Sequence, residues 1–204
     1  SADQIQTVLS KGFNIVHIDA HGEFDRWKVG DYTSRTEYTT EHASSLNSPN
    51  LTCIISSACF INNFAADTVC LSEAFIRSAT SGNIAFIGNS DYGLSNLTEE
   101  GSIWINSEFF RKLFQHDMRG LGEIVSSIKH AYVSSQSTYG YERWLTFVLN
   151  SLGDPNLQLN LAGYDEFDNV EILMSEIDGI EVNTGVDSCN ITLVCVDEDD
   201  NIIV

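Results

Sequence analysis

The stretch Leu51–Cys59 (LTCIISSAC) is the segment from which the fold class follows. Its centre is an almost unbroken apolar run, and a polar segment precedes it. A strand with apolar residues on both faces is typical of a parallel sheet that helices cover on both sides. The sequence therefore predicts a buried parallel strand that ends near Cys59.

The segments on either side of this strand alternate between helical and extended patterns. Upstream, Ala2–Ser10 carries apolar residues at helical spacing, and Phe13–Ile18 is a short run of β-favouring residues. Downstream, the predicted order is helix 71–79, strand 82–90, and helices near 102–115, 122–135 and 142–150. This alternation predicts an α/β layered domain with a parallel sheet.

The chain changes character near residue 160, where the helical patterns stop. Short strands are predicted at 170–175, 180–183 and 190–196, with turn residues between them. We therefore expect a first domain at 1–160 and a small antiparallel β module at 161–204, which is shorter than a complete immunoglobulin-like sandwich of about 100 residues. Within the first domain, residues 22–50 are polar and predict one long loop.

Composition argues against several classes of function. The 204 residues include 29 acidic and 10 basic side chains, and the resulting net charge of −19 repels nucleic acid. No apolar run reaches the ~18 residues of a membrane-spanning helix, and no signal peptide stands at the start. Because the chain begins without Met, we expect a processed or trimmed piece of a longer protein.

Metal-binding patterns are weak in this sequence. The five cysteines have no CxxC spacing, which disfavours a zinc ribbon. His17 and His21 lie four residues apart, but a metal pair at this spacing requires a helix, and the surrounding run favours a strand. No EF-hand pattern is present. We therefore assign no metal site and expect no cofactor, and a structural calcium ion stays open.

Two predicted strands end in side chains that are able to react. Asn14–Phe24 (NIVHIDAHGEF) contains an apolar run followed by His21, and the strand quoted first ends at Cys59. The carboxyl ends of neighbouring parallel strands share one edge of a sheet, so these two residues are expected to meet there. A cysteine nucleophile needs such a nearby base. Asp19 either orients the His21 ring or belongs to the strand-end turn.

The residue after the histidine adds to this prediction. Gly22 has no Cβ, so its backbone N–H can approach a substrate carbonyl closely. Together with the N–H of Cys59, it would stabilise the oxyanion of an acyl-transfer reaction. A single cysteine is often a small buried hydrophobic residue, so the prediction depends on the pairing of Cys59 with His21.

The wider pattern resembles the gingipain family of cysteine peptidases, which belongs to the caspase-like clan. ACFINNF at 58–64 precedes CLSEAF at 70–75, and a second cysteine therefore follows Cys59 by eleven positions. GNIAFIG at 82–88 and LGDP at 152–155 resemble the family's next strand and closing turn. The resemblance implies a caspase-like three-layer sandwich with a mainly parallel sheet, followed by the start of an immunoglobulin-like β-sandwich.

The resemblance also implies roles for individual residues. His21 corresponds to the catalytic histidine and Cys59 to the nucleophile, while Gly22 and the Cys59 amide correspond to the oxyanion hole. Trp27 resembles the aromatic residue that follows the family's His-Gly pair, and it is expected to contact substrate.

Specificity for arginine or lysine is not predicted. The family's tryptophan after the third strand has no counterpart in GNSDYGLSN at 88–96. Tyr92 is the only aromatic residue of that segment and Asp91 its only acidic one. Both are expected to take part in substrate binding.

The function implied by the resemblance is a cysteine endopeptidase that cleaves protein or peptide substrates. The family further implies a secreted or cell-surface location in a bacterium, and a partner in the N-terminal half of the catalytic domain, which this chain lacks. Two alternatives remain open: a surface-protein transpeptidase that uses the same residues, and a catalytically inactive caspase-like binding module.

Overall fold

The structure is a computed structural model. It describes residues 1–30, 35–65, 67–94, 101–135, 141–159, 170–174, 191–196 and 202–203. The chain divides into two compact units, Ser1–Leu159 and Asn160–Val204. No helix in the described part of the chain is long and apolar enough to cross a membrane.

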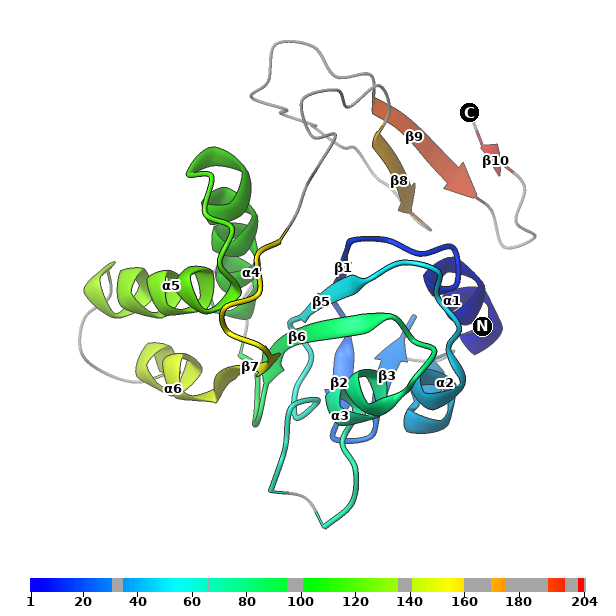
Figure 1. The fold of residues 1–204 in the computed structure, drawn as a ribbon, viewed down its shortest axis with the longest axis horizontal. Helices are drawn as coiled ribbons and strands as arrows, with labels where there is room; N and C mark the ends of the chain where they lie inside the picture. The colour runs from blue at the N-terminus through cyan, green and yellow to red at the C-terminus, as the bar shows by residue number, and fades with distance from the viewer. Residues whose placement is uncertain are drawn as a thin grey trace. The chain divides into compact units, whose positions relative to one another are not determined.

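A four-stranded sheet forms the centre of the first unit (Figure 1). Its strands, in spatial order, are β1 (Ile15–Ile18), β5 (Thr52–Ser56), β6 (Asn83–Asn89) and β7 (Leu149–Gly153). The first three strands are parallel, and β7 is antiparallel to β6. The predicted parallel strands are therefore present, and β5 is buried along its whole length.

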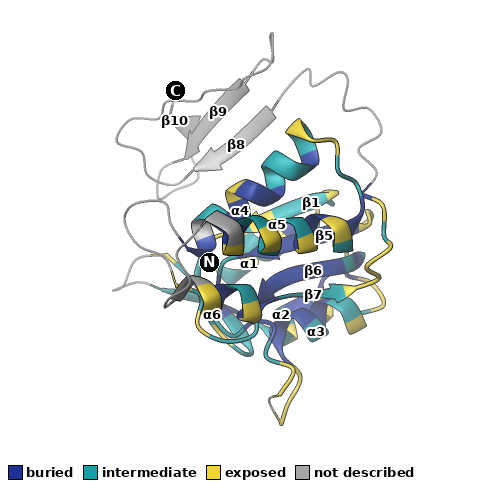
Figure 2. Ribbon diagram, turned by 90° about the vertical axis from the view of Figure 1, so that its left-hand side faces the viewer, coloured by how far each residue is buried: buried dark blue, intermediate teal, exposed yellow. Residues whose placement is uncertain are grey.

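Helices cover both faces of this sheet, as Figures 1 and 2 show from two directions. On one side lie α1 (Ala2–Leu9), α2 (Thr40–Ser45) and α3 (Leu71–Arg77). On the other side lie α4 (Ser102–Phe110), its π-helical continuation η1 (Arg111–Gln115), α5 (Leu121–Ser135) and α6 (Tyr141–Val148). The mixed α/β architecture with a mostly parallel sheet agrees with the sequence prediction.

The two faces of the sheet bury alternate residues of each strand. Ile54 and Phe86 belong to the core beneath α1, α2 and α3. Ile55 and Ile87 follow them in sequence, so they point to the opposite face, and they are also fully buried. This burial on both faces is what the apolar run of β5 predicted.

Residues 22–50 do not form the long loop that their polarity predicted. They contain a second sheet of three antiparallel strands, β2 (His21–Glu23), β3 (Arg26–Val29) and β4 (Thr36–Thr39), followed by α2. One face of this sheet packs on the core through Trp27 and Tyr38, which are completely buried. Arg26 pairs with Glu37 across the strands, and the many polar residues therefore belong to a half-exposed sheet.

The predicted helix at 142–150 is shorter than expected and leads directly into a strand. Helix α6 ends at Val148, and Leu149 already begins β7. Gly153 ends this strand with a φ of 126°, and a Cβ there would lie 2.6 Å from the carbonyl oxygen of Ile84. The LGDP motif therefore fits a close approach of two strands as well as a turn.

The second unit contains three short strands. These are β8 (Val170–Met174), β9 (Ile191–Val196) and β10 (Ile202–Ile203). The expectation of a purely antiparallel module is wrong, because β8 and β9 are parallel; β9 and β10 are antiparallel. The strand predicted at 180–183 lies outside the described residues. The immunoglobulin-like assignment stays a prediction.

Candidate active site

His21 and Cys59 lie at one edge of the central sheet. The register pairs Ile18 with Ser56 at the carboxyl ends of β1 and β5, so the segments that follow leave the sheet at the same level. The N–H of Ser57 donates to the carbonyl of Ile18 at 3.2 Å and joins these two segments. Both His21 and Cys59 line a pocket of about 510 Å³ at this edge.

The pocket contains polar groups besides these two residues. Asp19, Lys28 and Ser57 contribute to its wall, and Gly93 and Ser102 contribute from the segment after β6 and from α4. Ser57 donates its hydroxyl to the carboxylate of Asp19, and the ammonium of Lys28 pairs with Glu23. Of the two interpretations of Asp19, its hydrogen bond supports a role in joining the ends of β1 and β5.

The backbone around Cys59 is held by buried polar contacts. The side-chain amide of Asn89, at the end of β6, donates to the carbonyl of Ser57 at 2.8 Å. The N–H of Phe60 donates to the carbonyl of Asp91 at 3.0 Å. Phe60 has a φ of 60°, a left-handed conformation that costs a bulky residue free energy and that clusters at functional sites. These contacts fix the turn that carries Cys59.

The surroundings of Cys59 raise the pKa of its thiol and so favour the neutral form. Burial raises the pKa of Cys59, and the negative charge of Asp91 raises it further, while the nearby backbone of Gly93 lowers it. The thiol donates a hydrogen bond to the carbonyl oxygen of Gly93, with a sulfur–oxygen distance of 3.4 Å. Because the neutral form is favoured, Cys59 needs a base to become a nucleophile at neutral pH.

Gly22 touches the segment that carries Cys59. A Cβ at position 22 would lie 2.6 Å from the carbonyl oxygen of Cys59 and 2.9 Å from the Cβ of Ala58. These distances are too short for any side chain, so the close approach requires glycine. The structure thus brings together Gly22 and Cys59, the two residues predicted to form the oxyanion hole.

Trp27 lies in the core, which is a correction to its predicted contact with substrate. Its side chain is completely buried, and its ring lies 5.5 Å from the ring of Tyr38 and 5.3 Å from that of Phe75. The indole is the largest buried side chain beneath the small sheet. Its spacing after His-Gly places it on β3, opposite Gly22, where the inward face of the strand is apolar.

Asp91 and Tyr92 lie beside the pocket, directly before Gly93. The carboxylate of Asp91 accepts the N–H of Tyr92 at 2.8 Å. The ring of Tyr92 is exposed and meets the ring of Phe60 edge-on at 4.5 Å. The indole N–H of Trp144, on α6, donates to the carbonyl of Tyr92 at 3.0 Å. The two predicted residues are therefore tied to the turn that carries Cys59.

Sequence reasoning did not identify Ser57, Gly93 or Ser102 as part of the site. Ser57 lies inside the quoted strand segment, and its distance of two residues from Cys59 was a usable signal. Gly93 and Ser102 carry no comparable signal, because their position depends on how the chain returns across the sheet edge after β6.

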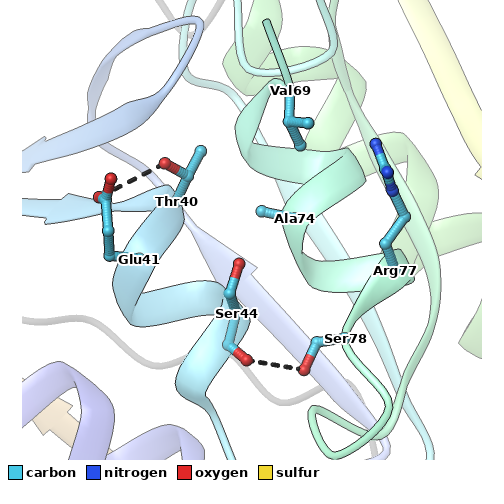
Figure 3. A pocket seen from close by; sticks show the side chains of 7 residues that line it. All are labelled: Thr40, Glu41, Ser44, Val69, Ala74, Arg77 and Ser78. Atoms are coloured by element: carbon cyan, nitrogen blue, oxygen red, sulfur yellow. Dashed lines mark hydrogen bonds between the residues drawn. The ribbon is translucent and has the colours of Figure 1, made fainter.

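A second pocket, of about 500 Å³, lies between α2 and α3 (Figure 3). Ser78 donates to the carbonyl of Ser44 at 3.0 Å, and the charged residues Glu41 and Arg77 also line this pocket. It contains neither His21 nor Cys59. Among the described residues, no group of three or more His, Cys, Asp or Glu side chains is arranged to hold a metal ion.

Solved structures with this fold include cysteine peptidases. The crystal structure of the Arg-specific cysteine proteinase gingipain R (RgpB) has 19% sequence identity and a TM-score of 0.62, covering 78% of this chain and 36% of that chain. A complex of the Porphyromonas gingivalis RgpB pro- and mature domains has 16% identity and a TM-score of 0.60, covering 78% of this chain and 37% of that chain. A structure described only as a protease has 18% identity and a TM-score of 0.59, covering 74% and 36%.

These likenesses confirm the caspase-like α/β fold that the sequence predicted. A search of curated proteins found no match. The chain spans little more than a third of the length of the gingipain structures that it matches.

The family model described as Peptidase family C25 matches residues 1–160, which is most of the chain. The chain therefore belongs to peptidase family C25.

Proposed function

We propose that this chain carries the nucleophile and the base of a cysteine peptidase. In the proposed first step, the Cys59 sulfur attacks the carbonyl carbon of a peptide bond and His21 accepts the thiol proton. The C–N bond then breaks, His21 returns the proton to the leaving amine, and the acyl group remains on sulfur as a thioester. Water attacks this thioester, its proton passes to His21, and the thiol is restored as the acid leaves.

The observation that carries this proposal is the shared pocket of His21 and Cys59. Two strands that are far apart in sequence bring them to one edge of the sheet, where open α/β sheets bind their ligands. His21 is exposed, so it can exchange protons with substrate and water. Family membership and the raised pKa of the Cys59 thiol support the same assignment, because a thiol with a raised pKa needs a base to become a nucleophile.

The oxyanion hole forms the second part of the proposal. The N–H groups of Gly22 and Cys59 would donate to the oxygen of the tetrahedral intermediate. The close contact of Gly22 with the Cys59 carbonyl supports this, because it fixes the two backbone segments against each other. Asp91 and Tyr92, which lie directly before Gly93, are proposed to contact substrate beside the pocket.

The test combines cleavage with alkylation of the thiol. Cys59→Ala should abolish hydrolysis of a mixed peptide library, and His21→Ala should slow both hydrolysis and iodoacetamide labelling of Cys59. Cys70→Ala is the matched control, because Cys70 is buried at the start of α3, outside this pocket. Peptide cleavage that survives in Cys59→Ala at the rate of the unaltered chain would refute the proposal.

The acceptor of the acyl group is tested in the same assay. Water as acceptor gives only the free acid, whereas an added amine gives an amide if the protein acts as a transpeptidase. Mass spectrometry of the products separates these two outcomes. The predicted secreted or cell-surface location, and a partner in the N-terminal half of the catalytic domain, are part of the proposal for the whole protein.

A further inference from the structure

The pocket contains a buried hydroxyl group that has no partner. Ser102, the first residue of α4, lines the pocket with only 3% of its surface exposed. Its Oγ has no hydrogen-bond partner among the described residues. Because a buried polar group without a partner destabilises the fold, such a group calls for an explanation by a ligand or by water.

Gly93 lies close to both this hydroxyl and the thiol of the proposed nucleophile. A Cβ at position 93 would lie 3.0 Å from Oγ of Ser102 and 2.7 Å from the carbonyl oxygen of Ser57. The carbonyl of Gly93 itself accepts the thiol of Cys59. The Ser102 hydroxyl therefore borders the same small space as the segment that carries the nucleophile.

Helix α4 adds a positive potential at the same place. The helix is nine residues long, and its N-cap residue is Gly101, which has no side chain to accept a first-turn N–H. The N–H of Ser102 donates to the carbonyl of Leu94 at 2.8 Å. The uncapped first turn and the Ser102 hydroxyl together favour an oxygen that accepts hydrogen bonds.

Asp19, another residue that lines the pocket, favours a hydrogen-bond donor instead. The carboxylate of Asp19 lines the pocket and already accepts the hydroxyl of Ser57. Its remaining acceptor capacity suits an N–H donor, and its charge disfavours a second carboxylate nearby. A ligand that satisfies both Ser102 and Asp19 carries an accepting oxygen and a donating nitrogen, and a primary carboxamide has both.

We propose that Ser102 and the first turn of α4 bind the side-chain oxygen of the residue whose carbonyl Cys59 attacks, and that this residue is glutamine or asparagine. The inference rests on the proposed function, because it takes the pocket as the site of peptide cleavage. Ser102 donates to the amide oxygen, and Asp19 accepts from the amide nitrogen.

Binding and cleavage are measured separately, so that the two proposals can fail independently. Binding uses the Cys59→Ala chain and dye-labelled peptides that are identical except for glutamine, norleucine, glutamate or arginine at the attacked residue. Cleavage uses the unaltered chain and the same peptides. Norleucine is the key comparison, because it has a similar length but no hydrogen-bonding group.

The glutamine peptide should bind and react about tenfold better than the norleucine peptide, the ratio expected for one or two net hydrogen bonds. Ser102→Ala should reduce this ratio toward one while leaving the norleucine peptide unchanged. Ser102→Thr, which keeps the hydroxyl, should retain the preference. Ser126→Ala, at an exposed position of α5, is the control that should have no effect.

Each outcome decides one of the proposals. A glutamine preference in binding without any cleavage refutes the peptidase proposal and supports the role of Ser102. Two results overturn the inference and leave the peptidase proposal intact. One is cleavage that prefers the arginine or glutamate peptide. The other is a ratio of the glutamine to the norleucine peptide that Ser102→Ala does not change. An equal loss with every peptide identifies Ser102 as a structural residue whose hydroxyl binds only water, which also overturns the inference. Absence of both binding and cleavage overturns both.

Discussion

The chemistry at Cys59 depends on a few neighbouring groups rather than on a strong local charge. Its thiol is half-buried and hydrogen-bonded to the carbonyl of Gly93, and burial and Asp91 raise its pKa. The sequence predicted the place of Cys59 and His21 because each follows a short apolar strand, which is a local signal. It did not predict Gly93 or Ser102, because they reach the pocket only after the chain crosses the sheet edge.

The charge of Asp91 makes a testable contribution at this scale. Because Asp91 raises the pKa of Cys59, Asp91→Asn should lower that pKa and increase the thiolate fraction near pH 7. The amide oxygen of asparagine can still accept the N–H of Tyr92. The rate of iodoacetamide labelling at Cys59 is measured from pH 6 to pH 10 by peptide mapping. The increase of this rate with pH should begin at a lower pH in the variant than in the unaltered chain.

Asp154→Asn serves as the control for this experiment. The carboxylate of Asp154 accepts the N–H of Asn156, and Asp154 is not among the groups that shift the pKa of Cys59. Burial raises the pKa of Cys53 to about 12, so this cysteine should stay unlabelled throughout. An unchanged or right-shifted labelling curve for Asp91→Asn would contradict the assigned role of the carboxylate.

Gly22 should tolerate no side chain. Gly22→Ala places a Cβ against the carbonyl oxygen of Cys59 and the Cβ of Ala58, and the expected loss in the free energy of unfolding is about 1–3 kcal/mol. Denaturant unfolding measures this loss. At Gly120 a Cβ would meet no atom closer than 3.4 Å, so Gly120→Ala is the matched control and should cost much less.

The elements show why one part of the fold was predictable and another was not. The strands β5 and β6 are buried on both faces, so their sequences are mostly apolar and easily identified, while β1 is an apolar run that is only partly buried. The small sheet β2-β3-β4 has one exposed face with ion pairs, such as that of Arg26 with Glu37, and its polarity suggested a loop. Only Trp27 and Tyr38 marked its inner face.

The end of β6 should control the turn that carries Cys59. Asn89→Ala removes the donor to the Ser57 carbonyl and leaves that carbonyl without its side-chain partner, at an expected cost of about 1–3 kcal/mol in unfolding free energy. The freed turn should also change the labelling rate of Cys59. Asn156→Ala, in an exposed turn, is the control. Unchanged stability and labelling in Asn89→Ala would show that the turn is held by its backbone contacts alone.

The first unit as a whole is organised around an aromatic core between the small sheet, the central sheet and α3. The rings of Tyr38, Phe75 and Phe86 each lie within about 6 Å of the ring of Trp27, and all four side chains are buried. Such a core joins segments from four different elements. The sequence indicated a sizeable core but not this arrangement, because the pairing of distant segments is not a local property.

Removal of the central indole should weaken the whole unit. Trp27→Ala should reduce the free energy of unfolding by about 3–5 kcal/mol, as is usual for a large buried aromatic side chain. Trp144→Ala is the comparison, since this tryptophan is 41% exposed and should cost far less. A similar cost for both variants, measured by denaturant unfolding, would contradict the central place of Trp27.

The contacts that raise the pKa of Cys59 have a further consequence for the protein in an oxidising environment. Peroxide attacks the thiolate and converts it to sulfenic acid, and then irreversibly to higher oxides, whereas the neutral thiol reacts slowly. Because burial and Asp91 raise the pKa of Cys59, we expect peroxide to oxidise it more slowly than a fully exposed cysteine. The same contacts that raise this pKa should therefore help to keep the sulfur in its reduced form.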